Sequence, residues 1–126
     1  MTKYYDLGFT KIEIQEDYIK STINKDHLVT PDHNKLLMEF VKKYFYNKPF
    51  VYISNRINIY SIDPTIYHEA TKISNLIGVA VVSKNERQRK LTELESKFFD
   101  KKLKYFTNIK EALTWKNKIL KNHIEL

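Results

Sequence analysis

The chain contains no cysteine, two glycines and three prolines among its 126 residues. Without cysteine, disulfides, thiolate metal sites and thiol nucleophiles are all excluded. Two glycines are too few for a phosphate-cradling loop or a dinucleotide-binding fingerprint. No apolar run approaches the roughly 20 residues that span a bilayer. The start of the chain, residues 1–6, also lacks the apolar core of a signal peptide. We therefore expect a cytoplasmic protein that carries no cofactor.

The composition is that of a folded protein, with 42% hydrophobic and 29% charged residues, and we expect a single domain over residues 1–126. The net charge of +7 is uneven: residues 1–63 hold 9 basic and 8 acidic side chains, whereas residues 64–126 hold 13 and 7. A basic half could attract nucleic acid or anionic lipid. A solvated lysine-rich surface explains the same excess, and the nearby aromatic residues have the spacing of core positions. The sequence therefore disfavours nucleic-acid binding.

Two short runs rich in β-branched residues, Phe50–Ile53 and Gly78–Val82, are typical of strands that are buried on both faces. Between them, Asp63-Pro64-Thr65 has the pattern of a helix start. Apolar residues then follow at helical spacing, at Ile66, Ala70, Ile73 and Ile77. A strand, a crossover helix and a second strand predict a βαβ unit with parallel strands.

Two further elements precede this unit. Residues 4–24 read as a β-hairpin around the turn Gln15-Glu16-Asp17, with Gly8 as a candidate bulge. Thr30 followed by Pro31 predicts the start of a long helix, because threonine caps free backbone N–H groups and proline suits the first helical position.

After the unit, Ser83 and Glu86 form a capping-box pattern that starts a third helix. We expect this helix to turn Leu91, Leu94 and Phe98 inward. A short strand over 103–106 and a last helix, beginning at a capping signal at 108–111, complete the chain. The element order β-β-α-β-α-β-α-β-α predicts an α/β fold. It has a single mixed β-sheet, with an N-terminal antiparallel hairpin and then βαβ units, flanked by about four helices.

Four segments resemble the SpoIIAA-like (STAS-like) family of small bacterial domains. They are Ile77–Ser83, Phe98-Phe99 at the end of a helix, Leu103–Phe106, and Glu111–Trp115. The helix entry Leu28-Val29-Thr30 also fits. The resemblance implies a mixed sheet flanked by helices and a protein that binds or regulates and does not catalyse. Some relatives are grouped with CRAL-TRIO lipid carriers, which implies an apolar ligand. Others are anti-sigma-factor antagonists, which are switched by phosphorylation of a serine before the second helix.

The nine residues 54–62 follow the central strand, where connections in α/β proteins usually run about 2 to 6 residues. Ligands of open α/β sheets bind beyond the carboxyl ends of the strands, which is where this loop lies. We therefore expect a partner or anion site formed by Ser54, Asn55, Arg56, Asn58, Tyr60 and Ser61. The alternative is a structural loop, in which Ile57, Ile59 and Ile62 are held in the core and the asparagines serve turn geometry.

In the resembled antagonists the phosphorylated serine lies in an Asp-Ser-Ser-Gly motif. Of that motif the present chain retains only Ser61, within Tyr60-Ser61-Ile62-Asp63. Ser61 is thus the candidate phosphorylation site that the resemblance implies. If the loop binds a partner, replacing Arg56 and Tyr60 by alanine should abolish capture of that partner and leave the melting temperature nearly unchanged.

A second candidate anion site is the start of the third helix, at Ser83, Lys84 and Asn85, where exposed N–H groups could hold a phosphate or carboxylate. Helix capping alone explains the same residues. The four histidines match no standard metal-ligand spacing, so no metal site is expected. No segment has the pattern of a catalytic motif, and we expect no enzyme.

The sequence therefore favours a regulatory protein that contacts another protein through the loop after the central strand. The alternative is a carrier of a lipid or other small apolar ligand, held between helices and sheet. Large apolar faces leave room for a homodimer.

Overall fold

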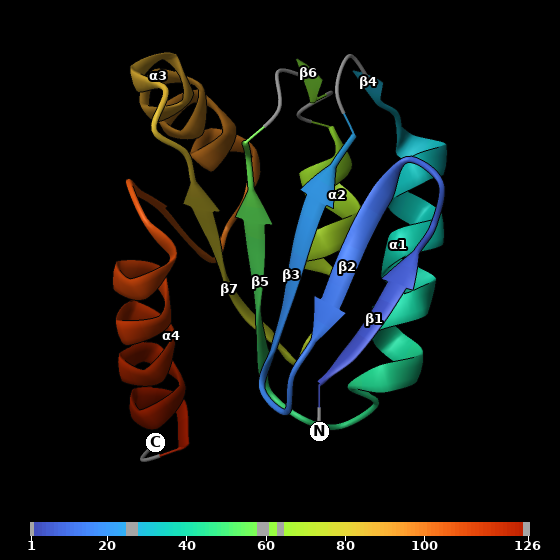
Figure 1. Cartoon of the computed structure of the whole chain (residues 1–126). Helices are drawn as coiled ribbons and strands as arrows, with labels where there is room; N and C mark the ends of the chain where they lie inside the picture. The colour runs from blue at the N-terminus through green and yellow to red at the C-terminus, as the bar shows by residue number, and fades with distance from the viewer. Residues whose placement is uncertain (1, 25–27, 58–60, 63–64, 125–126) are drawn as a thin grey trace.

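A six-stranded β-sheet forms the centre of the molecule, in the order β1-β2-β3-β5-β7-β8 (Figure 1). The computed structural model describes residues 2–24, 28–57, 61–62 and 65–124, with the backbone alone at 28, 29, 61, 62 and 124. The strands of this sheet are β1 (Lys3–Asp6), β2 (Thr10–Ile14), β3 (Tyr18–Ile23), β5 (Phe50–Asn55), β7 (Leu76–Val82) and β8 (Lys102–Phe106).

Strands β1, β2 and β3 form an antiparallel meander. The predicted hairpin is β2 and β3, which join at residues 15–17 as expected. A third strand, β1, precedes it. Gly8 lies in the turn between β1 and β2 with φ of +90°, a conformation that side chains with a Cβ rarely adopt, and its N–H donates to Asp6 Oδ1 at 2.8 Å. Gly8 therefore closes a turn and does not form the predicted bulge.

The other half of the sheet is parallel, because β3, β5, β7 and β8 all run in one direction. This confirms the predicted mixed sheet. The carboxyl ends of these four strands meet along one edge, at the top of Figure 1, which we call the carboxyl edge. The helices between the strands are α1 (Pro31–Tyr44), α2 (Ile66–Thr71), α3 (Glu86–Glu95) and, after β8, α4 (Ile109–Ile124).

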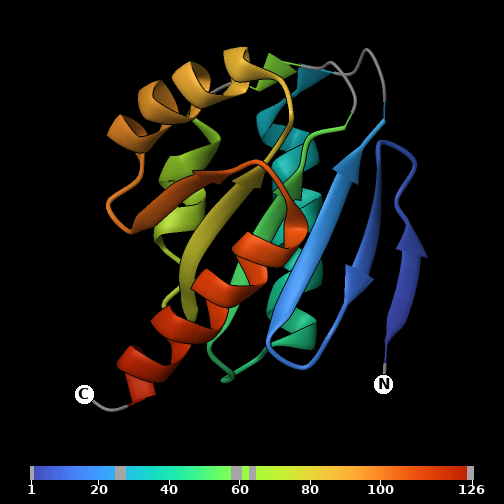
Figure 2. The same ribbon diagram turned by 60° about the vertical axis from the view of Figure 1, so that its left-hand side comes forward.

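Helices α1 and α2 cover one face of the sheet, and α4 covers the other face over its parallel half (Figure 2). The core on the α1 side contains Ile19, Val41 and Phe50, and the core on the α4 side contains Val51 and Ile53. Successive residues of β5 thus point to opposite faces, and both faces are buried, as the continuous apolar runs predicted.

A second, two-stranded sheet lies near the carboxyl edge. Strand β4 (Leu28–Val29) pairs in parallel with β6 (Ser61–Ile62), with Leu28 opposite Ser61. The segment that the sequence predicted as one long loop thus contains a strand. Asn58 and Tyr60, both predicted site residues, lie outside the described residues.

The helix starts agree in part with the predictions. Thr30 caps α1, where its hydroxyl accepts from the N–H of His33 at 3.3 Å. The predicted start of α2 at Asp63-Pro64 lies outside the described residues. Helix α2 ends at Thr71, so the prediction that it continues to Ile77 was wrong: Ile77 belongs to β7. Where apolar residues continue from a helix into the following strand, their spacing alone does not show where the helix ends.

The prediction for α3 was wrong in two respects. The helix is capped by Asn85, whose Oδ1 accepts from the N–H of Arg87 at 3.0 Å, and not by the predicted box of Ser83 and Glu86. Leu91 and Leu94, expected to point inward, are 44% and 51% exposed. The inward residues of this helix are polar, for a reason that lies in the contacts of Arg56 described below.

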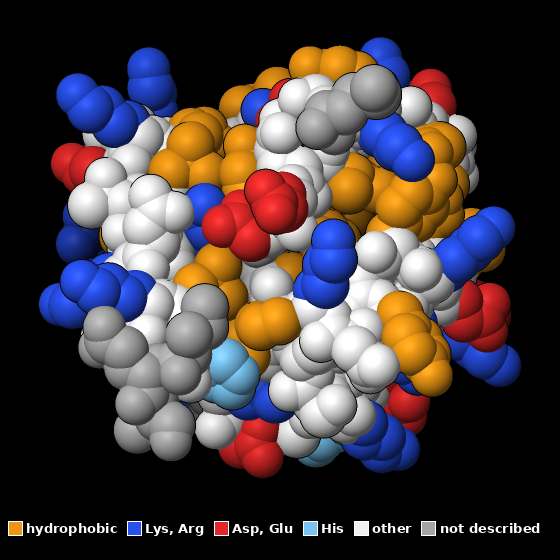
Figure 3. All heavy atoms as spheres, turned by 90° about the horizontal axis from the view of Figure 1, so that it is seen from below, with side chains coloured by type: hydrophobic (Ala, Val, Ile, Leu, Met, Phe, Trp, Pro, Cys, Tyr) orange, Lys and Arg blue, Asp and Glu red, His pale blue; other side chains and the backbone are white. Residues whose placement is uncertain are grey.

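The face opposite the carboxyl edge is shown in Figure 3, where basic and acidic side chains are interspersed around apolar ones. The excess of positive charge does not gather into one patch on this face. Among the described residues, no helix combines the length and the apolar character needed to cross a membrane.

Candidate binding groove at the carboxyl edge

An open groove of about 610 Å³ lies at the carboxyl edge, where β5, β7 and β8 end. Each of the three strands is followed by residues that line it. The lining residues are Asn55, Arg56, Ile57, Val82, Ser83, Lys84, Asn85, Thr107, Asn108 and Ile109. The groove therefore brings together the two candidate sites that the sequence placed separately, one after β5 and one at the start of α3.

The backbone fixes the walls of the groove to one another. The N–H of Arg56 donates to the carbonyl of Val82 at 2.8 Å, and the N–H of Ser83 donates to the carbonyl of Phe106 at 3.0 Å. These bonds extend the pairing of β5 with β7 and of β7 with β8 by one residue. The three strands therefore end in register with one another, as expected for adjacent parallel strands, and their connections leave the sheet side by side.

Two helices begin at the groove. At the start of α3, Ser83 is buried and its Oγ accepts from the N–H of Asn85 at 3.1 Å, while Asn85 caps the helix. At the start of α4, Asn108 Oδ1 accepts from the N–H of Glu111 at 2.9 Å. Free N–H groups at a helix start favour negative charge or a carbonyl oxygen nearby. The side chains of Lys84, Asn85 and Asn108 are exposed, so a ligand in the groove can reach them.

Ile57 is the most exposed apolar residue of the groove, with 71% of its surface open to solvent. In a purely structural loop this residue was expected to lie in the core, and it does not. Ile59 lies outside the described residues, and the side chain of Ile62 is not described. An exposed isoleucine beside exposed amides and one lysine gives the groove both an apolar and a polar contact surface.

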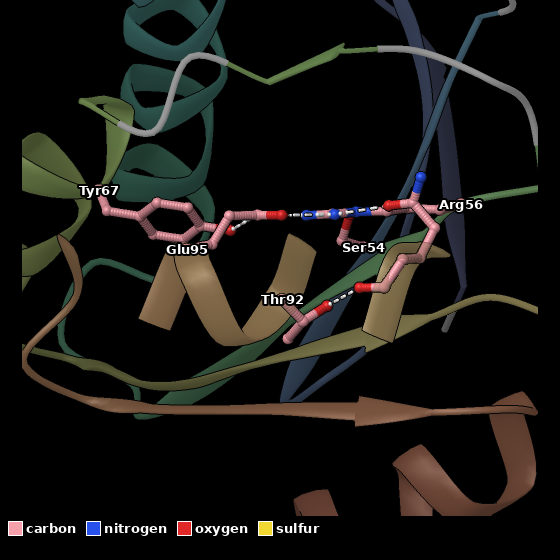
Figure 4. Close-up of polar contacts among 6 residues, drawn as sticks. Ser54, Arg56, Tyr67, Thr92 and Glu95 are labelled. Carbon is pink, nitrogen blue, oxygen red and sulfur yellow. Dashed lines mark hydrogen bonds and ion pairs between the residues drawn. The ribbon is translucent and has the colours of Figure 1, made fainter. Parts of the chain in front are cut away.

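Arg56, although it belongs to the lining of the groove, turns its guanidinium into the protein (Figure 4). Nη1 donates to Glu95 Oε2 at 2.8 Å, and Nη2 donates to Oε1 of the same carboxylate at 2.6 Å. The side chains of Arg56 and Glu95 are only 2% and 7% exposed. This is a two-bonded ion pair between the end of β5 and the last residue of α3, a geometry that arginine adopts with carboxylates.

Further polar groups complete the surroundings of this pair. Ser54 accepts from Arg56 Nε at 3.1 Å, Gln88 accepts from Nη1 at 2.9 Å, and the Tyr67 hydroxyl donates to Glu95 at 2.5 Å. The network therefore connects β5, α2 and α3. Removing one member of such a buried pair leaves a charge without its partner and costs about 3–5 kcal/mol.

Arg56 thus holds the end of β5 against α3 at the carboxyl edge, and its guanidinium does not present a free cation to the groove. The alanine test suggested by the sequence changes accordingly, because Arg56→Ala would lower stability along with any binding. Of the other predicted residues, Asn55 is half-buried and donates to Thr22 at 3.3 Å, while Ser54 lies beneath the groove on Arg56. Ser61 lies in β6, where its backbone alone is described.

Sequence reasoning missed the third wall, formed by Thr107, Asn108 and Ile109, although a signal for it was present. These residues directly follow a predicted strand, so the rule that located the other two walls applies to them as well. It also missed Glu95. No local pattern indicates that this helical glutamate faces an arginine 39 residues earlier.

The groove residues offer hydrogen bonds, one exposed ammonium group and apolar contact. No Asp, Glu or His belongs to the described lining, and within the described ranges no cluster of three or more such residues could hold a metal ion. The groove as described suits the binding of a polar or amphipathic chain segment.

A separate cavity of about 50 Å³ lies between α1, α2 and the sheet, directly beneath the Arg56 network. It is lined mainly by apolar side chains, with Asn34, Ser54, Arg56 and Tyr67 as polar members. Pockets for drug-sized ligands usually occupy about 300–1,000 Å³. In this conformation the cavity has room for a few water molecules and not for a lipid.

The architecture has a solved counterpart. The chain is similar to an uncharacterized protein of the DUF3478 family with a SpoIIAA-like fold from Shewanella loihica, known from a crystal structure. The TM-score is 0.60, the sequences are 14% identical, and the match covers 92% of this chain and 95% of that one. No protein-family model and no curated protein matches the chain. The chain therefore has a SpoIIAA-like fold, as its resemblance implied.

Proposed function

We propose that the protein is a non-catalytic regulatory protein that binds a partner protein in the groove at the carboxyl edge. The observation that carries this proposal is the convergence of three strand ends on one open groove of about 610 Å³. This volume lies within the range of recognised binding sites. The edge is also where α/β sheets bind their ligands.

The chemistry of the lining favours a segment of protein chain as the ligand. Asn85 and Asn108 can exchange hydrogen bonds with a peptide backbone, Ile57 can contact an apolar side chain, and Lys84 can pair with a carboxylate. The absence of an acid–base pair among the described lining residues supports binding without chemical conversion. Binding of a lipid, the alternative from the sequence, has no comparable support because the cavity beneath Arg56 is small.

Phosphorylation of Ser61 remains part of this proposal. Ser61 follows β5 and precedes α2 along the chain, in the strand β6 that pairs with β4, and a phosphate would add up to about two negative charges at neutral pH. A cytoplasmic location and a homodimer likewise remain predictions from the sequence.

The test uses exposed residues, so that loss of binding is not caused by loss of folding. The groove variant is Ile57→Asp combined with Lys84→Glu. The matched control is Tyr46→Asp combined with Lys48→Glu, which makes the same kind of change at the exposed turn between α1 and β5, at the opposite end of β5. Tagged forms of the original chain and both variants are used to capture proteins from an extract of the native host, with quantitative mass spectrometry as the readout.

The proposal expects at least one protein that is captured by the original chain and by the control but lost with the groove variant. Calorimetry with the two purified proteins then measures the loss of affinity directly. Equal capture of the same proteins by the groove variant, with unchanged thermal unfolding, would reject the groove as the binding site.

A further inference from the structure

Helix α3 is amphipathic in the opposite sense to an ordinary surface helix. Thr92 and Glu95 are buried against the protein, whereas Leu91 and Leu94 are 44% and 51% exposed. A helix on a protein surface normally turns its apolar stripe to the core. One exposed leucine needs no explanation, but here both leucines of the helix are exposed while Thr92 and Glu95 are buried.

The reversal has a structural cause on the inner side. Glu95 is held by the buried guanidinium of Arg56, and Arg89 lies over the ring of Tyr105 with its Cζ 4.9 Å from the ring centroid. Polar and cation–π contacts therefore fix the orientation of α3. Because Glu95 faces inward, the residues on the opposite side of the helix, which are three or four positions apart from one another, must face solvent.

The solvent-facing side of α3 combines basic residues with two leucines. Positions 87, 90, 91 and 94 follow one another at spacings of three, one and three, so they share one side of α3. Lys97 follows directly after the helix, in the 3-10 turn Ser96–Phe98. We call this side the outer flank of α3. It consists of Arg87, Lys90, Leu91 and Leu94, to which we add Lys97 of the turn that follows, and all five are exposed. Within the part of the chain that the structure describes, none of its three cations forms an ion pair.

We propose that the outer flank of α3 is a docking surface for an acidic amphipathic helix of a partner protein. The two leucines at positions i and i+3 match the apolar seam of a helix packed lengthwise on α3. The three surrounding cations match glutamates or aspartates that border such a seam, as in paired helices with complementary flanking charges. This surface is distinct from the groove and does not depend on it.

Charge also decides against the other occupants. In a symmetric pair of two copies, the outer flanks would bring arginine and lysine against arginine and lysine, which is unfavourable. A membrane-bound helix normally presents a broad apolar face with several large residues. The outer flank offers two leucines that are already half covered.

The probe for this surface is a synthetic, fluorescently labelled peptide of about three heptads, with leucine at the inner positions and glutamate at the flanking positions. Its binding to the full chain is followed by fluorescence anisotropy. Replacing Leu91 and Leu94 by serine should weaken binding about tenfold or more, because the apolar contact is lost. Replacing Arg87 and Lys90 by glutamine should weaken it as well and reduce its salt dependence, because two of the three cations are removed.

Two controls separate the docking surface from general stickiness. Leu36→Ser changes a leucine on α1 that is 49% exposed, and it should leave binding unchanged. A peptide with lysine in place of each glutamate should not bind. The groove variant of the preceding section should bind the acidic peptide normally, so that failure of either proposal can be recognised by itself.

Three results would overturn the inference. The first is the absence of saturable binding, or equal binding by the Leu91→Ser/Leu94→Ser variant. The second is Leu91-dependent flotation with phosphatidylserine vesicles in the absence of peptide binding, which would assign the flank to lipid. The third is a dimer, measured by light scattering, that Leu91→Ser dissociates, which would assign the flank to a second copy of the chain.

Discussion

The ion pair between Arg56 and Glu95 gives the sharpest prediction for stability. Both side chains are almost fully buried, and two hydrogen bonds of 2.6 and 2.8 Å join them. Replacing either residue alone by methionine leaves the other charge buried without a counter-ion. We expect each single variant to lower the free energy of unfolding by about 3–5 kcal/mol. For a chain of this size, the melting temperature should fall by roughly 10–20 °C.

The double variant provides the decisive comparison. Arg56→Met combined with Glu95→Met removes both charges, so no ion remains buried. Its loss of stability should therefore be smaller than the sum of the two single losses, by about 2 kcal/mol or more. Denaturant titration of the original chain and the three variants measures all four free energies.

An exposed ion pair serves as the control. Glu69 of α2 and Lys72, the residue after the helix, are 3.2 Å apart, but their side chains are 63% and 70% exposed. Glu69→Gln should change the free energy of unfolding by no more than about 0.5 kcal/mol. If Arg56→Met cost as little as this, or if the two methionine substitutions were simply additive, the reasoning from burial would be refuted.

Three further variants test other parts of the structure. Gly78→Ala should lower the free energy of unfolding by about 1–3 kcal/mol in denaturant titration, because the new Cβ would lie 2.9 Å from Ile119 Cδ1, 3.1 Å from the Trp115 ring and 3.2 Å from the backbone carbonyl of Lys102, so more than one flexible side chain must shift; an unchanged midpoint would contradict this packing. Asn85→Ala should cost about 1 kcal/mol, whereas Glu86→Ala, which removes only an exposed pair with Arg89, should cost no more than about 0.5 kcal/mol; the opposite order in thermal unfolding would restore the predicted capping box. Burial lowers the pKa of Lys101 below 10.5, so the folded chain releases this proton at a lower pH than the unfolded chain. The free energy of unfolding of the original chain, measured relative to that of the Lys101→Met variant, should therefore rise with pH between the lowered pKa and 10.5. A difference between the two that does not change with pH across that range would disprove the shift.

The local signals in the sequence were sufficient for most of the fold. Short β-branched runs identified β5 and β7, and Thr30 with Pro31 located the start of α1, because strand burial and helix capping depend on neighbouring residues. The same locality explains the errors. Ile77 has helical spacing and also belongs to a strand run, and only pairing with another strand decides between the two.

The candidate site was predictable only in part. The rule that ligands bind at the carboxyl ends of parallel strands placed Asn55 and Ser83 at one edge, and the fold brings them to one groove. The direction in which Arg56 points was not predictable. A loop arginine can face solvent or a buried carboxylate, and its choice depended on Glu95, which is distant in sequence.

The sequence by itself thus determined the order of the four helices and of the strands β2, β3, β5, β7 and β8, the parallel half of the sheet, and the edge at which we propose that a ligand binds. The tertiary structure alone decided which side of α3 faces inward. A periodic pattern identifies the two sides of a helix, and the usual rule assigns the apolar one to the core. Here the buried guanidinium of Arg56 required a carboxylate, because an unpaired buried charge costs more than leaving two leucines half exposed.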